Sequence, residues 1–200
     1  MFRHTVLGLV AALGFAAAPA AAETIQSFSD LCLEARGDRA DAGTRAKAAG
    51  WTQLPTEDLN LGGDLNDPSL FISLDPAKMS EDKEPPPFEM MMTGWGSAEQ
   101  VFKAGSMTID ACAVMSESGT VETLKGGMEA LLGAPPIDMN GQAAWFVSRS
   151  GDGMVAETEL DSFDDEDLLR LLQQRKLYVV TVLNEGQMAG LLLGAIRQAP

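Results

Sequence analysis

Two cysteines, Cys32 and Cys112, constrain the fold of this chain more than any other feature of the sequence. An even number of cysteines in an exported protein is typical of disulfide bonding, so the pair predicts one bridge, Cys32–Cys112. The bridge would close a loop of about 80 residues and stabilise the fold by roughly 4 kcal/mol in the chain-entropy description. Cys32 lies on an apolar helical face and Cys112 in a strand-like run, so a helix attached to a sheet is expected.

Two other states of these cysteines remain open at the level of sequence. They could be two buried free thiols, or they could form a redox-active pair. A redox-active pair is disfavoured because the chain has no Cys-x-x-Cys motif and because no basic residue flanks either cysteine to lower its pKa.

The first 22 residues have the three parts of a secretory signal peptide in the usual order. A short basic start over 1–4 is followed by an apolar run over 6–18 and by Ala20, Ala21 and Ala22 before the expected cleavage point. We therefore expect a signal peptide at 1–22 and a single exported domain at 23–200. The alternative, a membrane anchor, is disfavoured because the run is short for a bilayer span, and no later stretch is long enough to cross a membrane. The periplasm is the expected location, with full secretion as the alternative.

The single histidine, His4, lies inside the expected signal peptide. The mature chain would have no imidazole, which excludes Ser-His-Asp and Cys-His hydrolases and histidine-ligated zinc, copper and haem sites. No glycine-rich phosphate loop is present, and no cofactor is expected. The question of enzymatic activity stays open, with the missing catalytic motifs favouring a protein that is not an enzyme.

The charge of the chain restricts the partners that it could bind. Its formal net charge of −15 disfavours nucleic acids and anionic lipid head groups, which carry the same sign. A protein partner with a basic surface would fit this charge, although solubility alone is a sufficient reason for it. The oligomeric state is not predicted.

Residues 28–51 predict a helical hairpin. Gly37 suits the left-handed position that ends a helix, and Asp38 suits the N-cap of the next one. Gly50 would end the second helix. The tripeptide Arg36-Gly37-Asp38 can be an adhesion ligand in extracellular proteins, but here it is interpreted as the corner between the two helices.

The rest of the chain predicts an α+β fold with a mostly antiparallel sheet. The reason is that its strand-like segments follow one another as hairpins, rather than occurring one at a time between helices. Helices are expected to pack on one face of the sheet. Residues 75–87 predict an exposed acidic and proline-rich loop. The predicted strands are 69–74, 88–95, 98–104, 107–115, 143–150, 153–160 and 176–183, and the predicted helices are 121–132, 161–174 and 188–197.

Three groups of residues have the composition of ligand sites, but each is better explained in another way. Acidic residues near position 165 could bind calcium but also suit a helix N-terminus, and those near position 60 suit a loop. Methionines near position 91 could bind copper(I), although only Met90 and Met92 would point together on a strand. No metal or catalytic residue is therefore assigned. The three groups are Asp161, Asp164, Asp165, Glu166 and Asp167; Asp58, Asn60, Asp64, Asn66 and Asp67; and Met90, Met91, Met92, Met107 and Met115.

The segment FSDLCLEARGDRADAGTRAKAAGW, residues 28–51, resembles the start of small exported alphaproteobacterial proteins of uncharacterised function. The likeness consists of a cysteine-bearing helix, a Gly-Asp break, an alanine-rich helix and a Gly-Trp ending. It implies an exported, disulfide-bearing bacterial domain and brings no catalytic residue with it. The expected function is a periplasmic binding, accessory or inhibitor-type (immunity-like) protein. The alternative is a carboxylate-based hydrolase that acts on cell-envelope material.

Overall fold

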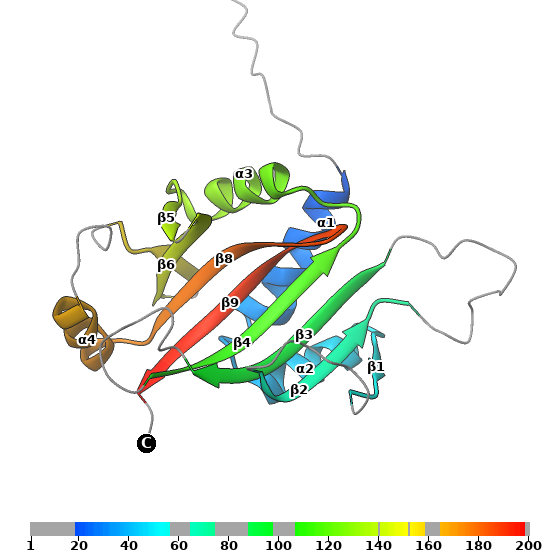
Figure 1. The fold of residues 1–200 in the computed structure, drawn as a ribbon, viewed down its shortest axis with the longest axis horizontal. Coiled ribbons are helices and arrows are strands. Elements are labelled where there is room, and N and C mark those ends of the chain that lie inside the picture. Colours follow the sequence, from blue (N-terminus) through cyan, green and yellow to red (C-terminus); the bar gives the residue numbers. More distant parts are fainter. Residues whose placement is uncertain are drawn as a thin grey trace, which may run out of the picture.

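A single antiparallel sheet of nine strands dominates the computed structural model, which describes residues 19–56, 65–74, 88–97, 107–139, 141–151, 153–158 and 165–198. The strands are β1 (Thr52–Leu54), β2 (Asn66–Ile72), β3 (Glu89–Ser97), β4 (Met107–Ser116), β5 (Ile137–Met139), β6 (Gln142–Ser150), β7 (Gly153–Ala156), β8 (Leu177–Glu185) and β9 (Met188–Gln198). Their order is β1-β2-β3-β4-β9-β8-β6-β5, and β7 also pairs with β6 (Figure 1). The α+β class and the antiparallel sheet are therefore as predicted.

The helices of the described chain do not all belong to one layer. They are α1 (Pro19–Phe28), which continues into a π-helical turn η1 (Ser29–Leu33), α2 (Arg39–Ala48), α3 (Val121–Leu132) and α4 (Asp165–Gln174). In Figure 1, α1 and α2 lie behind the sheet. The predicted packing of all helices on one face is not confirmed, because α4 packs against Leu177 and Ile196. These two side chains alternate with Tyr178 and Ala195, which belong to the core shared with α1, α2 and α3.

The turn between η1 and α2 uses the signals expected from the sequence. Gly37 has a φ of 69°, and a Cβ added to it would lie 2.5 Å from the Cβ of Ala195, so both backbone and space demand glycine. Asp38 caps α2 by accepting a hydrogen bond from the Asp41 amide at 3.0 Å. The turn thus joins two helical segments, but their packing as a helical hairpin is not established.

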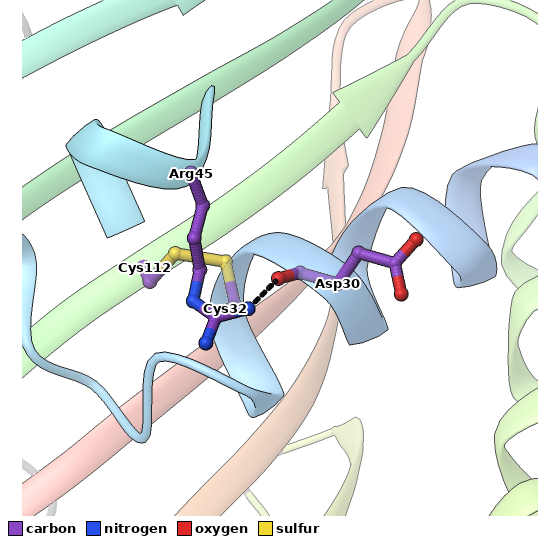
Figure 2. Close-up of a disulfide and its surroundings, with 4 residues drawn as sticks. All are labelled: Asp30, Cys32, Arg45 and Cys112. Carbon is purple, nitrogen blue, oxygen red and sulfur yellow. Dashed lines mark hydrogen bonds between the residues drawn. A yellow bond between two sulfur atoms is a disulfide. The ribbon is translucent and has the colours of Figure 1, made fainter. Parts of the chain in front are cut away.

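The predicted disulfide Cys32–Cys112 is present and joins η1 to β4, with 5.6 Å between the two Cα atoms. Both cysteines are buried, and they are bonded to each other, so the alternative of two buried free thiols is wrong. Figure 2 shows the bridge beside a hydrogen bond of 3.2 Å that Arg45 Nη1 donates to the carbonyl oxygen of Asp30. Among the helices of the described residues, none is both long and apolar enough to cross a bilayer.

Most predicted elements in the described part of the chain are confirmed, but one prediction is wrong. Residues 188–197 form strand β9 rather than a helix. The strand lies between β4 and β8 and is buried over most of its length on both faces, so its sequence has no polar alternation that would distinguish it from a buried helix. The short strands β1 and β5 were not predicted. The predicted strand at 98–104 and the predicted loop at 75–87 lie outside the described residues.

Candidate functional site

A polar cleft of about 490 Å³ lies where the N-terminal end of α2 meets the sheet, and its volume is in the usual range of ligand sites. We call it the charged cleft. Its lining combines three carboxylates, two guanidinium groups and two hydroxyl groups from four strands and one helix. The lining residues are Asp38, Arg39, Ala40, Asp67, Ser69, Thr93, Asp110 and Arg197.

Strand register assembles the sheet side of the charged cleft. Thr93 lies opposite Cys112, and Asp110 is two residues before Cys112, so Thr93 and Asp110 point to the face that carries the disulfide. Arg197 pairs with Thr108 and is therefore the diagonal neighbour of Asp110 on the same face. Arg39 approaches from the opposite side as the first residue of α2.

Asp110 is the most unusual residue of the cleft because it is a carboxylate with only 6% of its surface exposed. Its Oδ2 forms an ion pair with Arg197. Its Oδ1 is buried without a hydrogen-bond partner. Oδ1 also forms an ion pair with Arg39 Nε, although their distance of 3.7 Å is too long for a hydrogen bond. A buried acceptor without a donor costs about 1–3 kcal/mol, so the cleft contains an unsatisfied group that a ligand could satisfy.

The other two carboxylates of the cleft already have partners. Asp67 accepts a hydrogen bond of 2.8 Å from the indole Nε1 of Trp95 and lies 3.8 Å from Arg39 Nη1. It has a positive φ of 47°, a conformation that aspartate tolerates better than most residues. Asp38 caps α2. Among the described residues of the cleft, Asp110 Oδ1 is thus a buried carboxylate oxygen that lacks a hydrogen-bond donor.

The structure places few of the candidate groups from the sequence in this cleft. Asp67 contributes, and its neighbour Asn66 donates a hydrogen bond of 3.3 Å to the carbonyl oxygen of Trp95. Residues 57–64 lie outside the described part of the chain. So do residues 161–164 and the side chains at 165–168 at the start of α4. Within the described residues, no group of three or more histidine, cysteine or acidic side chains could hold a metal ion.

The methionines belong to the packing of the sheet. Met91 is buried in the core on the helix side, whereas Met90 and Met92 point to the other face, as predicted. Met115 pairs with Met90 on that second face, and Met107 packs with Leu171 of α4. These positions explain the methionines without a metal.

Five polar residues of the cleft were missed by sequence reasoning, namely Arg39, Ser69, Thr93, Asp110 and Arg197. One signal was available for Asp110, since a carboxylate in the middle of the apolar run over 107–115 needs a partner or a function. The others could not be found without the strand register. No protein-family model, curated protein or solved structure matches the chain. Its function must therefore be argued from the geometry of its sites.

Proposed function

We propose that this chain is an exported binding protein, an accessory or inhibitor-type factor of the periplasm, and that the charged cleft holds a cationic side chain of a protein partner. The observation that carries the proposal is Asp110 Oδ1, a buried acceptor without a donor in the cleft lining. A lysine ammonium or an arginine guanidinium would supply the missing hydrogen-bond donor. The net charge of −15 favours the same kind of partner, one with a basic surface.

The charge inside the cleft also favours a cation. Three carboxylates line it against the two guanidinium groups of Arg39 and Arg197. The hydroxyl groups of Ser69 and Thr93 add neutral acceptors beside them, and Thr93 has only 2% of its surface exposed. A bound ammonium group would therefore meet acceptors on several sides.

The alternative function, a carboxylate-based hydrolase acting on cell-envelope material, has less support from this geometry. Hydrolysis of a glycosidic bond requires two carboxyl groups, one to protonate the leaving group and one to attack or to activate water. In the cleft, Asp38 is engaged by an amide of α2 and Asp67 by the indole of Trp95. Asp110 is held in ion pairs with Arg39 and Arg197, so this arrangement suits binding better than that chemistry.

The exported location is part of the proposal and rests on the sequence. The signal peptide at 1–22 and the resemblance of residues 28–51 to uncharacterised alphaproteobacterial proteins both support a periplasmic protein. The disulfide Cys32–Cys112 is compatible with that compartment, since disulfides persist where the environment is oxidising.

The experiment that tests this function uses residues 23–200 as bait for a periplasmic extract, followed by calorimetry with the purified partner. The test variant is Asp110→Asn, which keeps the shape of the side chain and removes its charge. The control is Glu117→Gln, an exposed position outside the cleft. We expect a basic protein to bind the wild type and the control equally, and to bind Asp110→Asn about tenfold more weakly, because a hydrogen bond between charged groups is lost.

Two results would count against the proposal. Equal affinity of the partner for the wild type and Asp110→Asn would remove the cleft from the binding surface. Release of soluble fragments from purified peptidoglycan by the wild type, abolished in Asp110→Asn, would establish the hydrolase instead.

A further inference from the structure

A second hollow, of about 230 Å³, lies between η1, the C-terminal end of α3 and the hairpin formed by β6 and β7. We call it the arginine pocket. Four apolar side chains and two guanidinium groups make up most of its lining. They are Leu33, Leu131, Leu132 and Met154, together with Arg36 and Arg149.

Arg36 occupies a backbone position that disfavours arginine. Its φ is 56°, in the left-handed region that residues other than glycine, asparagine and aspartate rarely adopt. Gly37 follows with a φ of 69°, so two consecutive left-handed residues form the turn. Backbone strain of this kind often accompanies a functional side chain, and here the residue belongs to the lining of a pocket.

Positive charge is present in the arginine pocket although the net charge of the protein is −15. Among the described residues of its lining, Arg36 and Arg149 are the cations and Glu34 is the anion. Burial raises the pKa of the Tyr178 hydroxyl, and the positive charges of both arginines lower it by a smaller amount. Both arginines line the same pocket.

The two arginines differ in how they are held. Arg149 Nε donates a hydrogen bond of 2.8 Å to the carbonyl oxygen of Gly151, which orients its guanidinium group. Among the residues that the structure describes, no carboxylate forms an ion pair with Arg36. Beside them, Leu131 is one of two large apolar side chains that are exposed in the described chain, with 47% of its surface accessible.

We propose that the arginine pocket binds a small monocarboxylate with an apolar body. The carboxylate would bind Arg36 and Arg149, since guanidinium groups pair with carboxylates through two parallel hydrogen bonds. The apolar body would lie against Leu131, Leu132 and Met154 and would remove the exposed surface of Leu131 from water. This site is separate from the charged cleft, to which the same turn contributes Asp38 rather than Arg36.

The test is titration calorimetry of residues 23–200 with hexanoate, and with hexan-1-ol and inorganic phosphate as matched probes. The variant Arg36→Gly removes the guanidinium group and also suits the φ of 56°, so it should fold at least as well as the wild type. Lys125→Gln is the control, an exposed change of charge on α3. We expect hexanoate to bind the wild type and the control alike, and to bind Arg36→Gly about tenfold more weakly, because a charge-assisted hydrogen bond is lost.

The matched probes decide which part of the proposal fails. Equal binding of hexan-1-ol and hexanoate would show an apolar cavity without anion recognition. Displacement of hexanoate by inorganic phosphate at equal concentration would show a simple anion site without an apolar component. Unchanged hexanoate affinity in Arg36→Gly, with urea unfolding confirming that the variant is folded, would also overturn the proposal. None of these results bears on partner binding at Asp110.

Discussion

Tyr178 is the only tyrosine of the chain, and it is a buried ionisable group that can be observed directly. It has 2% of its surface exposed, in the core under α1, α2 and α3. Burial raises the pKa of its hydroxyl above 10.0, and the charges of Arg36 and Arg149 oppose that rise without cancelling it. The folded protein therefore holds this proton more tightly than the unfolded chain does.

This difference predicts a specific loss of stability at alkaline pH. The contribution of Tyr178 to the free energy of unfolding is fully present below pH 10.0. It declines as the pH rises from there through the higher pKa of the folded state. Tyr178→Phe should remove this part of the decline. Urea unfolding of both proteins across the alkaline range measures it, and the phenolate absorbance follows the same proton. A native phenol that titrates below pH 10.0 would contradict the prediction.

Helix α3 contains two adjacent glycines that the structure distinguishes clearly. Gly126 is exposed, and a Cβ added there would meet nothing within 4 Å. A Cβ on Gly127 would lie 2.0 Å from Cδ1 of Ile25, so α1 and α3 approach each other closely at this point. Gly126 thus lowers the stability of α3 without a packing reason, whereas Gly127 leaves space for Ile25 of α1.

The pair predicts different effects of the same substitution. Gly126→Ala should raise the free energy of unfolding by about 0.5–1 kcal/mol through helix propensity. Gly127→Ala should be less stable than Gly126→Ala by up to about 1 kcal/mol, because Cδ1 of Ile25, the far end of a flexible side chain, must move aside. Adding Ile25→Val to Gly127→Ala removes Cδ1 and should recover part of that loss. Urea unfolding of the four proteins compares them, and equal stability of the two alanine variants would show that the helices do not approach closely here.

Elements with local signals were predictable from the sequence. The sequence Gly-Asp-Gly at 151–153 is a hairpin signal, and β6 and β7 pair as it predicts. Thr120 is the N-cap of α3, and its side chain accepts a hydrogen bond from the Thr123 amide. Strand β9 was not predictable, because a strand buried on both faces and rich in leucine and alanine has the composition of an apolar helix. Its partners β4 and β8 decide its conformation.

The charged cleft was predictable only in part, for a related reason. Asp67 lies in a segment whose composition indicates a ligand site or a polar loop. Thr93, Asp110 and Arg197 are separated by long stretches of chain, and only the register of β3, β4 and β9 brings them together. Propensity and periodicity carry no information on such pairings.

The whole molecule depends on one covalent link between its helical and sheet layers. The bridge Cys32–Cys112 joins residues 80 positions apart and fixes η1 to β4, which has β3 and β9 as its neighbours. It lies on the same face as the core that α1, α2 and α3 form with the sheet. The bridge therefore restricts the unfolded chain over a large loop.

Removing the bridge should cost a large share of the stability. The double variant Cys32→Ala/Cys112→Ala is expected to lose about 4 kcal/mol of unfolding free energy, the chain-entropy value for a loop of this length. Urea unfolding measures the loss. A reductant should lower the unfolding midpoint of the wild type and leave that of the double variant unchanged. Equal sensitivity of the two proteins to the reductant would contradict the assignment.

The position of β9 has a consequence for how the chain matures. Strand β9 is the last of the nine strands in the sequence, yet it lies inside the sheet between β4 and β8. While the chain emerges from the ribosome, the edges of β4 and β8 that will meet it stay unpaired until residues 188–198 arrive. Open strand edges recruit other chains. Premature termination before β9 should therefore yield aggregating material rather than a smaller folded domain.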